Sequence, residues 1–73
     1  MRRQVAIRGE EIRLGQLLKL AGVVDSGSEA KALLAQDGAL VNGEREDRRG
    51  RRLRVGDVVA LGELELELVT ASD

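Results

Sequence analysis

The chain has 73 residues and contains no aromatic residue, cysteine or histidine, so its core must consist of leucine, valine, isoleucine and alanine. This composition excludes disulfide bonds, thiol nucleophiles, imidazole bases and zinc sites, and with them most classes of enzyme. The formal net charge is −1, but residues 44–54 carry six basic and three acidic side chains, whereas residues 55–73 carry five acidic and no basic ones, which predicts surfaces of opposite sign.

The chain shows no linker, low-complexity tract or internal repeat, so residues 1–73 are expected to form one small domain. No apolar run approaches the roughly 20 residues that a membrane-spanning helix needs. Residues 1–10, "MRRQVAIRGE", lack the apolar core of a secretion signal. Together with the absence of cysteine, these features favour a cytoplasmic protein with no membrane partner.

Two amphipathic helices are expected after a short strand at residues 4–7. Within residues 12–22, apolar side chains recur at i, i+3, i+4 and i+7 and so share one helical face. Gly15 interrupts this helix at a cost of about 1 kcal/mol relative to alanine. Ser26 and Glu29 have the spacing of a capping box at the start of the second helix, and Gly38 suits the left-handed residue that follows its end.

The remaining segments are expected to be strands. The dipeptide Asn42-Gly43 is typical of a tight hairpin turn in which both residues take positive φ. A second turn at Gly56-Asp57 precedes an apolar strand at residues 58–61. In residues 63–69, "ELELELV", the alternation places glutamates on a solvated face and leucines in the core. The predicted fold is α+β, with two short helices packed on a small antiparallel sheet of four to five strands.

Two further patterns give weak functional signals. The glutamates at 63, 65 and 67 share one face, but no other catalytic or metal-binding residue type converges on them. The segment "GVVDSGS" precedes the second helix, whose first amides could attract a phosphate, yet the Walker pattern is missing. We therefore expect no catalytic residue, no metal site and no cofactor.

The strongest polar signal is "DRRGRRLR", residues 47–54, which holds five arginines. These could pair internally with Glu44, Glu46 and Asp47, but surface ion pairs contribute only about 0–1 kcal/mol each and do not require so many arginines. Arginine offers a fork of donors that matches phosphate oxygens. Because no aromatic side chain is available for base stacking, the loop favours the phosphate backbone of structured RNA over unpaired strands.

Four short motifs follow one another over residues 12–61, namely Arg13-Leu14, Ser26 with Ala30, Val41-Asn42-Gly43 and Gly56-Asp57. In this order and spacing they resemble the alpha-L motif, also called the S-four RNA-binding domain. The strings "LGQLLKLA" (14–21), "SGSEAK" (26–31) and "RRGRRL" (48–53) are similar to those of its small stand-alone bacterial members. The resemblance implies a non-enzymatic protein that binds ribosomal or transfer RNA through its two helices and the adjoining hairpin loop.

Carried over by position, the resemblance implies that Lys19, Lys31 and the loop arginines lie on the RNA surface. We expect four arginines to grip phosphates, Arg48, Arg49, Arg51 and Arg52, and four further residues to support them, Lys19, Lys31, Arg45 and Arg54. Gly27 stands where many family members have an arginine, and Arg45 stands where an apolar residue is common. The first departure shifts the expected contacts towards Lys31 and the loop.

The leading hypothesis is a monomer that binds the ribosome or its precursors during ribosome assembly, with the acidic residues 63–67 facing away from RNA. The alternative is a protein-interaction adaptor that docks its arginine loop on an acidic partner surface.

Overall fold

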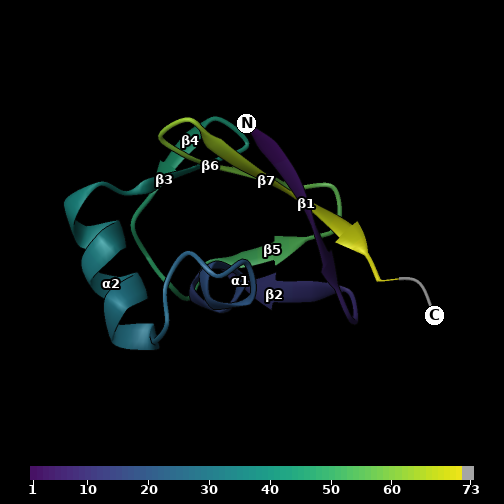
Figure 1. Cartoon of the computed structure of the whole chain (residues 1–73), viewed down its shortest axis with the longest axis horizontal. Coiled ribbons are helices and arrows are strands. Elements are labelled where there is room, and N and C mark those ends of the chain that lie inside the picture. The colour runs from purple at the N-terminus through teal and green to yellow at the C-terminus, as the bar shows by residue number, and fades with distance from the viewer. Residues whose placement is uncertain (72–73) are drawn as a thin grey trace.

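In the computed structural model of the chain, residues 1–71 are described and form seven strands and two helices (Figure 1). In chain order these are β1 (Arg2–Ile7), β2 (Glu11–Arg13), α1 (Leu14–Leu20), α2 (Gly27–Gln36), β3 (Ala39–Val41), β4 (Glu44–Glu46), β5 (Arg52–Arg54), β6 (Val58–Leu61) and β7 (Leu64–Thr70). The predicted α+β class is confirmed. Neither helix in this part of the chain is long and apolar enough to cross a membrane.

The main sheet has five strands in the order β1-β7-β6-β3-β4. It is mixed, because β1 runs parallel to β7 while the other neighbours are antiparallel. The expected antiparallel sheet of four to five strands is therefore confirmed in its number of strands and wrong only for the parallel β1–β7 pair. β1 and β7 lie at opposite ends of the sequence, so no local turn signal could reveal their direction.

A second, two-stranded sheet joins β2 to β5 and was not expected from the sequence. Ile12 lies opposite Leu53 in this antiparallel pair, and Leu53 is fully buried. The packing of Ile12 and Leu53 on the core explains why residues 12–13, the start of the expected first helix, are extended and why α1 begins only at Leu14.

The apolar stripes expected for both helices belong to the core, and α1 lies against α2 and β2 (Figure 1). Leu14, Leu17 and Leu18 of α1 are fully buried, as are Ala30 and Leu34 of α2. The remaining core comes from inward-facing strand residues, with the largest contributions from Ile7, Val41, Leu53, Val59, Leu66 and Leu68. A single apolar core thus holds both sheets and both helices together.

The start of α2 differs from the expected capping box in one respect. The Ser26 Oγ accepts a hydrogen bond from the Glu29 amide at 3.2 Å, as expected. The Glu29 carboxylate, however, accepts from the amide of Asp25, at 3.3 Å, instead of that of Ser26. The helix then ends before Gly38, which has a φ of 69° and confirms the expected left-handed position.

The alternation in β7 is also confirmed. Leu66 and Leu68 are buried, whereas Glu65 and Glu67 lie on the other face, each 3.4 Å from a polar side chain of β1, those of Arg2 and Gln4.

Asn42 links two of the sequence motifs. Asn42 and Gly43 have φ values of 52° and 87°, as the hairpin turn requires. The Asn42 side chain donates to the Asp57 carboxylate at 3.0 Å and accepts from the Val58 amide at 2.9 Å. The Val-Asn-Gly and Gly-Asp motifs therefore stabilise the fold by contacting each other.

This contact predicts that Asn42→Ala lowers the free energy of unfolding by roughly 2–3 kcal/mol, because alanine loses both hydrogen bonds and strains the left-handed backbone. Asn42→Gly is the matched control, since it loses the hydrogen bonds but tolerates positive φ, and it should be less destabilising. Urea denaturation of the three proteins measures this. Equal stability of the parent and the alanine variant would contradict the assignment.

Candidate nucleic-acid interface

The segment between β4 and β5, residues 47–51, is attached to the amino end of α1 by main-chain hydrogen bonds. The Leu14 amide donates to the Arg51 carbonyl at 2.8 Å, and the Gly15 amide donates to the Arg49 carbonyl at 2.9 Å. A Cβ at Gly15 would lie 3.1 Å from the Arg49 Cβ and 3.4 Å from its carbonyl oxygen. Gly15, which is unfavourable for helix stability, thus allows the loop to lie close against α1.

On its other side, the same loop is held by Glu46, the only buried charged residue of the described part of the chain, with 5% of its surface exposed. Its carboxylate accepts five hydrogen bonds. Two come from the amides of Asp47 and Arg48, at 3.1 and 3.0 Å. Two come from the Arg48 guanidinium, at 2.9 and 3.1 Å, and one from Arg51, at 3.0 Å. These hydrogen bonds, foremost those of the Arg48 side chain, lower the pKa of Glu46 to about 2.

Two of the four arginines expected to face RNA therefore donate to a carboxylate within the chain. Arg48 keeps 75% of its side chain exposed and Arg51 keeps 34%. Together with Glu46 they form a cluster of net charge +1.

The third of these arginines, Arg49, lies over the start of α2. Its Nη1 is 3.4 Å from the Gly27 carbonyl oxygen, and a Cβ at Gly27 would be 3.2 Å from the same nitrogen. Arg49 thus brings a guanidinium to Gly27, the position at which the resemblance described above implies an arginine. Lys31 follows Gly27 by one helical turn and is exposed on the same face of α2.

Around Arg49 lies a surface hollow of about 360 Å³, which we call the basic hollow. It is lined by Arg13, Gly15, Gln16, Lys19, Gly27, Arg49 and Gly50. None of these residues is acidic. The Arg13 guanidinium donates to the Gly50 carbonyl at 3.2 Å, which ties it to the loop.

The β2–β5 pair adds further positive charge beside this hollow. Arg13 lies directly opposite Arg52, and Glu11 lies directly opposite Arg54. Opposed residues in an antiparallel pair project to the same side, where two like charges destabilise the pairing. The sequence did not mark Arg13 as a candidate, because only the pairing of β2 with β5 brings it beside Arg52.

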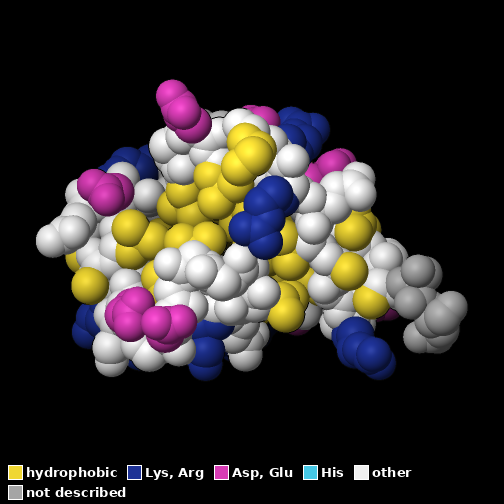
Figure 2. Space-filling view, viewed as in Figure 1, with side chains coloured by type: hydrophobic (Ala, Val, Ile, Leu, Met, Phe, Trp, Pro, Cys, Tyr) yellow, Lys and Arg dark blue, Asp and Glu magenta, His cyan; other side chains and the backbone are white. Residues whose placement is uncertain are grey.

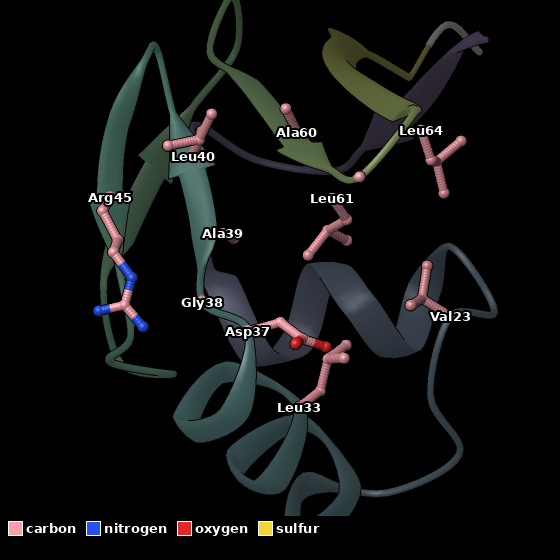
Figure 3. A pocket seen from close by; sticks show the side chains of 11 residues that line it. Val23, Leu33, Asp37, Gly38, Ala39, Leu40, Arg45, Ala60, Leu61 and Leu64 are labelled. Atoms are coloured by element: carbon pink, nitrogen blue, oxygen red, sulfur yellow. The ribbon is translucent and has the colours of Figure 1, made fainter.

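Arg45 is not brought together with the other basic residues. It lies opposite Leu40 on β3, and its guanidinium packs against Gly38, where a Cβ would be 2.8 Å from its Nε. A different hollow of about 670 Å³ is lined by Leu33, Leu40 and Leu61. Figure 3 shows Arg45 at the side of this hollow. Apolar side chains gather on this face of the molecule (Figure 2).

The comparisons with known proteins agree with this architecture. The family model described as "S4 domain" matches residues 5–69, so the chain belongs to the S4 domain family. The chain is 51% identical over 61 residues to the "Probable ribosome maturation protein RlbA" of Bacillus subtilis (strain 168), covering 84% of this chain and 86% of that protein. It is also 36% identical over 67 residues to a "Tyrosine--tRNA ligase" of Burkholderia lata, covering 90% of this chain but only 16% of the ligase. The resemblance to small stand-alone members of the family is thereby confirmed.

The approach of the loop to α1 predicts that Gly15→Ala lowers the free energy of unfolding by roughly 1–3 kcal/mol through overpacking, although helix propensity alone would raise it by about 1 kcal/mol. Gly27→Ala is the control, because its Cβ would meet only the flexible end of the Arg49 side chain. Thermal and urea unfolding distinguish the two effects. A Gly15→Ala protein more stable than the parent would contradict the docking of the loop.

The low pKa of Glu46 predicts an acid-sensitive contribution to stability. Since its folded pKa of about 2 lies below the ordinary value of 4.5, the unfolded chain takes up this proton first as the pH falls. The contribution is complete above about pH 4.5 and is lost progressively towards pH 2. The difference in unfolding free energy between the parent and Glu46→Gln should therefore shrink over this range, and a difference independent of pH would contradict the assignment.

Proposed function

We propose that this chain is a non-enzymatic RNA-binding protein that holds the phosphate backbone of structured ribosomal RNA and acts in ribosome maturation. The observation that carries the proposal is the basic hollow, where Arg13, Lys19 and Arg49 converge from α1, its preceding strand and the loop without an acidic lining residue. Convergent arginine and lysine donors suit phosphate oxygens.

The pairing of Arg13 with Arg52 supports the same reading. Two like charges held opposite each other cost stability in the free protein. A phosphate placed between them would remove this repulsion, and each neutralised phosphate also releases counterions. The chain has no aromatic residue on which a base could stack, so recognition rests on backbone contacts and the shape of the RNA.

The two relatives described above support ribosomal RNA as the proposed ligand. The protein whose name refers to ribosome maturation matches this chain over most of both lengths, whereas the ligase shares only a small part of its length. We therefore favour ribosomal over transfer RNA and propose that the protein acts as a cytoplasmic monomer on ribosome precursors.

The phosphate contacts are proposed for Arg13, Lys19, Arg49 and Arg52. Lys31 and Arg54 flank them, Arg48 and Arg51 contribute through their cluster with Glu46, and Arg45 lies outside the interface.

The proposal predicts that about four phosphate contacts give a slope of log affinity against log salt of roughly −3 to −4. The double variant Arg49→Ser/Arg52→Ser should reduce the slope by about 2 and weaken binding by at least roughly tenfold at 0.1 M salt. Affinities for a structured fragment of ribosomal RNA, measured across a salt series, give both values.

The matched control is Arg2→Ser/Arg45→Ser, which removes the same charge from the strands at the two edges of the main sheet and should change the slope little. Equal slopes in the parent and the Arg49/Arg52 variant would sink the proposal. Partners that remain bound after nuclease treatment, and are lost from the same variant, would instead favour a protein adaptor.

A further inference from the structure

We infer that Glu46 is a positioning residue for the RNA interface: its carboxylate holds the arginine loop in the conformation that binds phosphate. This inference rests on the proposed function and assigns a role to an acidic residue in the part of the chain that carries the largest excess of positive charge. A carboxylate there opposes RNA binding by its charge, so its presence needs a compensating reason.

The geometry supplies that reason. Glu46 and its β3 neighbour Ala39 are both buried, and the Glu46 carboxylate lies beneath the loop. Its five bonds engage the first two amides of the loop and the guanidinium groups of Arg48 and Arg51. The Arg51 amide also donates to the Arg48 carbonyl at 3.2 Å, which closes the turn between the two arginines.

The loop is thus fixed on two sides. Glu46 holds residues 47, 48 and 51, while the first two amides of α1 hold the carbonyls of Arg49 and Arg51. Arg49 lies between these attachment points, and its side chain is thereby directed to Gly27 and the basic hollow. A loop held only by α1 would leave the direction of the Arg49 side chain less determined, and RNA binding would have to order it.

Charge and position predict opposite results when Glu46 is changed. Glu46→Gln removes one negative charge and so raises the net charge of the interface by one. An effect of charge alone would therefore tighten RNA binding and steepen its salt dependence. Loss of positioning weakens binding in spite of the added charge, because glutamine offers one acceptor oxygen, and its amide group would point donors at arginine donors. We expect roughly tenfold weaker binding.

Glu44→Gln is the matched control. Glu44 lies two residues away on β4 and is exposed, and its removal adds the same charge without touching the cluster. It should leave binding unchanged or make it slightly tighter. Glu46→Asp provides a second variant, which keeps the charge but shortens the side chain. Loss of positioning predicts weaker RNA binding for this variant too, whereas an effect of charge alone predicts no change in affinity.

The experiment measures affinity for a ribosomal RNA fragment across a salt series for the full-length parent and the three variants, with circular dichroism to establish folding. Amide hydrogen exchange at Leu14 and Gly15, without RNA, reports whether the loop remains on α1, and faster exchange is expected in Glu46→Gln and Glu46→Asp. If Glu46→Gln does not fold, Glu46→Asp decides between the two effects.

Tighter binding by Glu46→Gln, or parent-like binding by Glu46→Asp, in a parent that binds RNA would overturn the positioning role alone. A parent that does not bind structured RNA would overturn the proposed function and, with it, this role of Glu46.

Discussion

The main-chain contact between residues 47–51 and the first turn of α1 is the constraint on which the rest of the structure depends. It joins the start of α1 to the arginine loop, and it uses the Leu14 and Gly15 amides, which at an exposed helix start would be free to bind an anion. The helix start is therefore occupied by the protein itself. Under the proposed function, phosphate recognition would fall to the side chains gathered around this contact, chiefly Arg13 and Arg49.

A second contact, the pairing of β2 with β5, explains how a small protein tolerates so much like charge. The β2–β5 pair has two different faces: Ile12 and Leu53 pack towards the core, while Arg13 and Arg52 project to the opposite side. Burial of the apolar face stabilises the pairing that the charged face weakens. One face of this short ladder thus stabilises the fold, and the other carries the charges that we propose contact phosphate.

Local sequence patterns predicted the helical stripes, the positive φ of Asn42 and Gly43, and the alternation of β7, because each depends on neighbours within a few residues. The parallel pairing of β1 with β7 and the pairing of β2 with β5 join distant segments and left no such signal. The burial of Glu46 was equally hidden. In "ERE" of β4, both glutamates fall on the same side of the strand by period, and only the loop folding back over one of them distinguishes it from its exposed neighbour.

The positions of the charged side chains explain how a chain with a net charge of −1 can carry a surface suited to RNA. Glu46 is paired with Arg48 and Arg51 of the loop. Glu65 and Glu67 lie on β7 beside polar side chains of β1. Exposed charges interact over about 10 Å at 0.1 M salt. If RNA binds as proposed, the field that a phosphate meets at the basic hollow is set by the nearest basic side chains and by how firmly the loop holds them. The conformation of the loop would then matter more for binding than the total charge of the chain.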